Sequence, residues 1–171
     1  MDSRTKTTLT TLIFTALIAI PALATDLDTT AILDIVEGIT VTETSALNFG
    51  DVALNTGTMT VGTDGAVTDP DFLSFDAATV SQGVFSINAI AGNAYDIVIT
   101  ENVPAVGLIL DNFQINIDGG ADEAGANSFI GVTLSAATST LNLGADITVD
   151  ALTASLGDGQ TIGYQVSVNF N

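Results

Sequence analysis

Three acidic residues, Asp118, Asp122 and Glu123, lie close together in the chain and flank the adjacent glycines Gly119 and Gly120. Calcium takes about 6–8 oxygen ligands, and acid-rich loops can supply them. The spacing matches neither an EF-hand loop nor a calcium-binding repeat. Asp and Gly are also favoured in turns for backbone reasons. The segment is therefore either a weak calcium site or a turn, and no other cofactor is expected.

The rest of the composition excludes most catalytic chemistry. The sequence holds 20 Asp and Glu against 2 Lys and Arg, with no His, Cys or Trp. Nucleophilic catalysis that relies on His or Cys is impossible, as are zinc sites built on imidazole or thiolate. Nucleic-acid binding needs positive charge that this chain lacks. Carboxylate pairs like those of glycosidases can arise by chance, but there are few aromatic residues to hold a sugar. We predict that the protein is not an enzyme and binds no nucleic acid.

Residues 1–24 have the features of a cleavable secretory signal peptide. Both basic residues, Arg4 and Lys6, precede an apolar run at residues 12–20, and small residues lead up to a cleavage position after Ala24. The alternative is a membrane anchor, but a spanning helix needs roughly 20 apolar residues and this run is shorter. The sequence predicts export to the periplasm, the cell surface or the medium, with no membrane span after cleavage.

Hydrophobic residues alternate with polar ones through most of the remaining chain. Tyr164, Val166, Val168 and Phe170 share one face of a strand at 163–170, and polar residues share the other. This period of two is typical of half-buried strands. The same alternation recurs at residues 85–90, 95–99 and 113–118, and shorter strands are expected at residues 39–41, 58–61, 107–110, 132–134, 139–143 and 146–149.

Glycines and the Asp-Gly-Gly segment separate these strands at turn-like intervals. Gly144 is expected in a tight turn that joins two short strands, because glycine tolerates backbone conformations that other residues avoid. Short strands and frequent turns predict an all-β fold, an antiparallel two-sheet sandwich of the immunoglobulin-like or pilin-like kind. We expect one such domain over residues 38–171.

Residues 25–37 are expected to form an N-terminal extension or the first strand of the domain. Their second half, from Ala31 to Glu37, is apolar enough for a strand. This segment either pairs within its own domain or completes the sheet of a neighbour. The expected partners are therefore copies of the chain itself or other surface proteins, bound by strand pairing.

The order of the strand motifs resembles a known bacterial family, domain of unknown function 4402. The motifs are Ile39-Thr40-Val41, Leu47-Asn48-Phe49-Gly50, Gly57 to Val61, Phe85 to Ala89, Tyr95 to Ile99, Leu141 to Val149 and Gly163 to Asn171. The resemblance implies a small exported protein, mostly found in Gram-negative bacteria, without established catalytic residues.

More distantly, the chain is similar to fimbrial and spore-coat-type sandwich subunits, from which it differs in having no disulfide. Composition and resemblance together suggest a non-catalytic surface or extracellular protein, structural and fimbria-like. The alternative is a secreted calcium- or glycan-binding module.

The excess of acidic over basic residues leads to a first prediction. The formal net charge is −18, and cleavage of the signal peptide would remove both basic residues. Repulsion among carboxylates opposes folding, and salt screens it because the Debye length falls from about 10 Å at 0.1 M to about 3 Å at 1 M. We expect the melting temperature of the processed protein to rise as NaCl increases to seawater-like concentrations. A melting temperature that is flat or falls with salt would contradict this.

Overall fold

A computed structural model describes residues 38–52, 54–68, 78–103, 105–125, 127–154 and 160–171. The predicted signal peptide at 1–24 and the extension at 25–37 lie outside the described residues. The regular elements within the described ranges are all β-strands, so the prediction of an all-β fold is confirmed. These ranges contain no helix that could cross a membrane.

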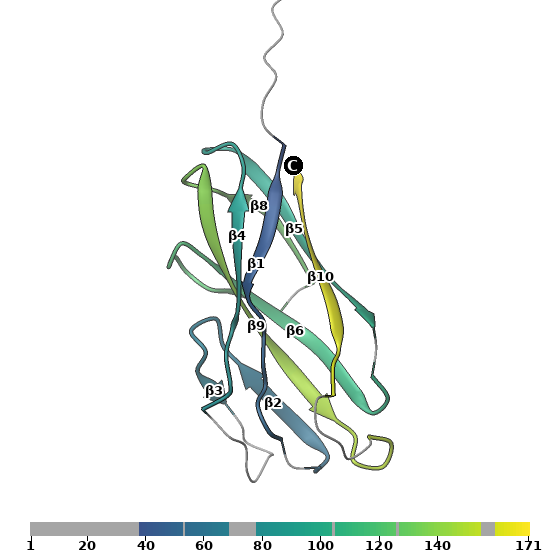
Figure 1. The fold of residues 1–171 in the computed structure, drawn as a ribbon. Coiled ribbons are helices and arrows are strands. Elements are labelled where there is room, and N and C mark those ends of the chain that lie inside the picture. The colour runs from purple at the N-terminus through teal and green to yellow at the C-terminus, as the bar shows by residue number, and fades with distance from the viewer. Residues whose placement is uncertain (1–37, 53, 69–77, 104, 126, 155–159) are drawn as a thin grey trace, which may run out of the picture. The chain divides into compact units, whose positions relative to one another are not determined.

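The described strands form two antiparallel sheets (Figure 1). The strands of the larger sheet are β1 (Thr40–Ser45), β2 (Gly57–Val61), β3 (Val67–Thr68), β4 (Gly83–Asn88), β6 (Leu108–Ile117), β7 (Glu123–Ala124) and β9 (Thr138–Val149). Those of the smaller sheet are β5 (Ala94–Val103), β8 (Ser128–Thr133) and β10 (Gly163–Phe170). The larger sheet has the order β1-β4-β9-β2-β3, and β6 pairs with both β9 and β7. The smaller sheet has the order β10-β5-β8.

Strand β9 organises the larger sheet. On one side it pairs with β6, from Leu141 to Val149. On the other side it pairs first with β4, up to Leu143, and then with β2, from Ala145 onward. Two strands that are distant in the sequence therefore share one edge of β9, and they meet beside Gly144.

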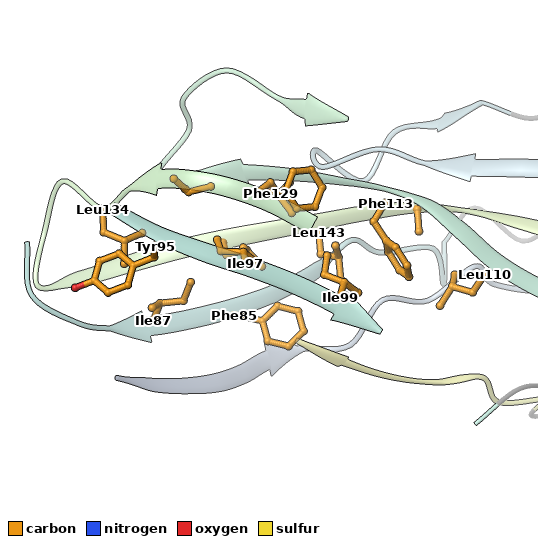
Figure 2. Close-up of a cluster of buried hydrophobic side chains, with 14 residues drawn as sticks. Phe85, Ile87, Tyr95, Ile97, Ile99, Leu110, Phe113, Phe129, Leu134 and Leu143 are labelled. Carbon is orange, nitrogen blue, oxygen red and sulfur yellow. The ribbon is translucent and has the colours of Figure 1, made fainter. Parts of the chain in front are cut away.

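The main core lies between the two sheets. Phe85, Leu143 and Phe113 come from the larger sheet, and they pack in one buried cluster with Ile97 and Phe129 from the smaller sheet. Figure 2 shows these side chains with their neighbours. Burying one such aliphatic or aromatic side chain contributes about 1.5–3 kcal/mol. The apolar residues of the alternating pattern therefore pack between the two sheets, as the sequence predicts.

A second cluster extends the core of the larger sheet beyond Gly144. Met59 and Val61 of β2 pack there with Ile147 and Val149 of β9. Residues of β9 that precede this segment, such as Leu143, belong to the main cluster instead. A single long strand thus supplies side chains to both clusters.

Tyr164 of β10 joins the smaller sheet to the larger one on the side where β1 and β10 lie next to each other (Figure 1). Its ring packs edge-on against Phe85 with centroids 6.4 Å apart. Its hydroxyl donates a hydrogen bond to Glu43 Oε1 (3.3 Å) and accepts one from the amide of Leu47 (3.5 Å). Burial, together with the nearby Glu43 charge, raises the pKa of Tyr164 to about 12, although the Leu47 amide acts in the opposite direction. A partly buried tyrosine hydroxyl needs a hydrogen-bond partner, and that of Tyr164 has two.

The last strand matches its predicted limits and faces, with one difference at its end. Val166 and Val168 pack against the main core, as the alternation predicts. Phe170 is 54% exposed, but its ring lies 5.0 Å from that of the fully buried Tyr95. Phe170 therefore covers the end of the core rather than entering it.

The predicted turn at Gly144 is wrong. Residues 139–143 and 146–149 are parts of one continuous strand, and Gly144 lies in its middle. The physical reason for glycine is close backbone approach. A Cβ atom here would meet the Val61 carbonyl oxygen and would lie 2.8 Å from the carbonyl carbon of Gly62 and 2.9 Å from the amide nitrogen of Thr63. Residues 107–110 and 113–118 are likewise largely one strand, β6, interrupted by a bulge.

This close approach predicts that Gly144→Ala is destabilising. The atoms that a Cβ would meet are backbone atoms, which cannot rotate away as a flexible side chain can. We expect a loss of about 2 kcal/mol or more in the free energy of unfolding, measured by urea denaturation. Gly38→Ala is the matched control, because a Cβ at Gly38 meets nothing within 4 Å. Equal urea midpoints for the two variants would show that the backbone is not this close.

Candidate functional site: carboxylates and their hydrogen-bond partners

The outer face of the larger sheet carries polar side chains in rows that cross the strands. Thr40, Asn88 and Thr138 are neighbours on β1, β4 and β9. The Asn88 side-chain amide donates to the Thr40 hydroxyl (3.3 Å), and the Thr138 hydroxyl donates to Asn88 Oδ1 (2.7 Å). Thr58 and Thr148 share a hydroxyl–hydroxyl hydrogen bond of 2.8 Å between β2 and β9. Such cross-strand pairs help to fix the register of the sheet.

Asp146 lies in the middle of this face and links three strands. Its Oδ1 accepts a hydrogen bond from the Thr60 hydroxyl of β2, and its Oδ2 accepts one from Asn112 Nδ2 of β6 (2.8 Å). Asn112 sits in the β6 bulge with φ at 47°, in the left-handed region that Asn tolerates better than most residues. The bulge thereby brings the Asn112 amide to the carboxylate.

Asp122, one of the three predicted calcium ligands, is held by two neutral donors. Its Oδ1 accepts hydrogen bonds from the Thr63 hydroxyl (2.7 Å) and from Asn116 Nδ2 (2.8 Å). The bond from Thr63, followed by that from Asn116, lowers the pKa of the Asp122 carboxyl, because both favour the charged form. Asn116 Nδ2 also donates to the Gly120 carbonyl (2.7 Å), whereas its Oδ1 is buried without a hydrogen-bond partner.

The other two predicted ligands, Asp118 and Glu123, have surroundings that differ from those of Asp122. Asp118 accepts hydrogen bonds from the backbone amide of Thr140 (2.7 Å) and from the Ser135 hydroxyl (3.3 Å). Glu123 is exposed on β7, and its carboxylate makes no hydrogen bond or ion pair with the rest of the described chain. Within the described ranges, no three acidic side chains gather in a group that could hold a metal ion. The calcium site remains a prediction, and the predicted turn is present, with left-handed φ angles at Asp118 and Gly119.

Sequence reasoning missed Asp146, the carboxylate that links three strands of the larger sheet. The alternation places both Thr60 and Asp146 on outward positions, but they are 86 residues apart in sequence. Only the pairing of β2 with β9 brings them together. The available signal was the frequency of Thr and Asn on the outward faces of the predicted strands, since these side chains can donate hydrogen bonds to acids.

The lowered pKa of Asp122 predicts a specific dependence of stability on pH. Because the folded-state pKa lies below the unfolded value, the stabilisation is complete above the unfolded pKa of about 3.9 and is lost as pH falls through the folded-state pKa. Asp122→Asn cannot titrate. We therefore expect a smaller loss of stability than in the natural protein between about pH 5 and pH 2.5, measured as urea midpoints.

Asp51→Asn is the control for removing one charge, because Asp51 is exposed and its carboxylate makes no hydrogen bond or ion pair within the described residues. If both variants show the same dependence on pH, the hydrogen bonds from Thr63 and Asn116 do not stabilise the Asp122 carboxylate.

Comparison with known proteins identifies a family for this chain. No curated protein and no solved structure matches the chain. One family model does match, over residues 39–170, which includes every described strand. The chain therefore belongs to the family described as domain of unknown function (DUF4402).

Proposed function

We propose that the protein is an exported, non-catalytic structural subunit of the bacterial surface, with an immunoglobulin-like or pilin-like sandwich and a fimbria-like mode of assembly. The observation that carries the proposal is the position of β10 at the end of the smaller sheet. β10 pairs with β5 from Gly163 to Phe170 and pairs with no other described strand. An edge strand presents backbone N–H and C=O groups that can pair with a strand from another chain.

The chemistry of the side chains supports a structural role rather than catalysis. Asp118, Asp122 and Asp146 each accept two hydrogen bonds, and most of these come from residues on other strands or loops of the larger sheet. These bonds stabilise strand register and turns. A hydrolytic enzyme would need carboxylates for catalysis, whereas the carboxylates at these three positions stabilise the fold.

Export is proposed from the sequence. The segment 1–24 has the basic start, apolar run and small residues of a signal peptide. In the processed chain no basic side chain would remain. The hydrogen bonds described above stabilise the carboxylates in the absence of basic side chains. Such a domain suits the periplasm, the cell surface or the medium of a Gram-negative bacterium.

Residues 25–37 offer a donor strand for this assembly. They directly precede the domain, and Ile32, Leu33, Ile35 and Val36 give them an apolar character. We propose that this segment pairs with an edge strand of a neighbouring subunit. The competing arrangement, in which it is the first strand of its own domain, makes the opposite prediction for folding.

Deleting residues 25–37 separates the two arrangements. For strand exchange we expect surface polymers to disappear from shear fractions, as seen by electron microscopy with an antibody to the chain, while the melting temperature stays unchanged. A subtler variant, Ile32→Asn with Ile35→Asn, keeps the length of the segment and should act in the same way. Thr29→Asn with Thr30→Asn is the matched control. Loss of folding on deletion would show that the segment belongs to its own domain, and the absence of polymers from the natural protein would refute the proposal.

A calcium- or glycan-binding module is the second candidate function. The observation that favours it is the buried Oδ1 of Asn116, which has no hydrogen-bond partner although Nδ2 of the same side chain bonds to Asp122. Amide and carboxylate oxygens are the ligand types that calcium takes. Isothermal titration of the purified protein with calcium tests this function directly. Absence of heat at millimolar calcium would remove the calcium version, and absence of saturable binding on a glycan panel would remove the other.

A further inference from the structure

A cleft of about 210 Å³ lies where β6 and β7 of the larger sheet come close to β8 of the smaller sheet. Its lining residues are Ile115, Ile117, Gly120, Ala121, Glu123, Val132 and Thr133. Ile115 and Val132 are members of the main core, and Ile117 packs against that core. The cleft therefore borders the main core.

Glu123 is the one charged residue among those that line this cleft. It differs from its neighbours Asp118 and Asp122, whose carboxylates accept hydrogen bonds from within the domain. Glu123 makes no such bond to any described residue. The described residues also contain no Lys, Arg or His, because the two basic residues of the sequence are Arg4 and Lys6. A cation for Glu123 must therefore come from outside the domain.

The size of the cleft limits what it can take. Pockets for small organic ligands usually have volumes of roughly 300–1,000 Å³, so this cleft is small for them. It suits a single long side chain. Lysine and arginine combine an apolar stem, which packs on apolar surface, with a cationic head that stays at the solvent boundary. Such a stem would pack mainly on the partly exposed Ile117, because Ile115 and Val132 are only 1% and 6% exposed, and its head would reach Glu123.

We propose that this cleft binds a lysine or arginine side chain from an extended segment of another protein. The net negative charge of the chain favours the approach of a basic partner over an acidic one. A second copy is a poor source, because its basic residues lie within the first six positions and would leave with the signal peptide. The inference does not depend on polymer formation, so it can fail or succeed apart from the proposed function.

Nuclear magnetic resonance with capped pentapeptides tests the proposal on the purified protein. The probe is Thr-Val-Lys-Val-Thr, and the comparison peptides replace the lysine with arginine, with acetyl-lysine or with norleucine. We expect the lysine and arginine peptides to shift the amide resonances of Ile117, Val132 and Thr133 in a saturable way. The acetyl-lysine and norleucine peptides should bind about threefold to fivefold more weakly, as is typical for the loss of one exposed ion pair.

Three variants locate the binding. Glu123→Gln should weaken the lysine peptide to the level of the acetyl-lysine peptide, whereas Asp51→Asn removes the same charge elsewhere and should change affinity less than twofold. Ala121→Phe places a large side chain at an exposed position that lines the cleft and should abolish binding. Equal affinities for the lysine and acetyl-lysine peptides would overturn the proposal. Resonance shifts spread evenly over the acidic surface would also overturn it, as would lysine-peptide binding that Glu123→Gln leaves unchanged. The comparison of the lysine and acetyl-lysine peptides uses the natural protein, so it does not depend on any variant folding.

Discussion

The structure depends on one electrostatic constraint: its carboxylates have no side-chain cation to pair with. All described residues follow Arg4 and Lys6 in the sequence, so the domain contains acids without a single basic residue. The fold meets this constraint with neutral donors. Asp146 is held by a threonine and an asparagine, Asp122 by another such pair, and Asp118 by a backbone amide and a serine. Hydrogen bonds to a charged acceptor are individually stronger than those between neutral groups, so each of these acids can stabilise the sheet without a salt bridge.

Placing these donors requires particular backbone geometry. Asn112 reaches Asp146 because β6 carries a bulge with a left-handed residue, and Thr60 reaches it because β2 runs along the second half of β9. That course of β2 in turn depends on Gly144, where the backbone of β2 and the following turn passes so close that no Cβ fits. The polar face and the packing of the sheet are thus parts of the same arrangement around β9.

The sequence predicts the faces of strands well and their connections less well. Alternation correctly places Phe85, Ile97 and Ile115 in the core, because burial of every second residue is a local property of a strand. It fails at Gly144, which looks like a turn residue locally and is required instead by a strand from elsewhere in the chain. The acids show the same limit. Asp118, Asp122 and Glu123 are neighbours in sequence but have different surroundings, whereas the contact between Thr60 and Asp146 depends on tertiary pairing that no local pattern contains.

The central position of β9 has a consequence for how the chain reaches its native state. β2 and β4 both pair with β9, which is synthesised long after them, since the Thr60–Asp146 contact alone spans 86 residues. Folds dominated by such non-local pairings form slowly, because loop closure must precede the gain from contact. Until β9 pairs with them, we expect β2 and β4 to leave backbone edges open to other chains. We expect the net charge of −18 to keep unfinished molecules apart, so that the acids that repel one another in the folded state also reduce association while the chain folds.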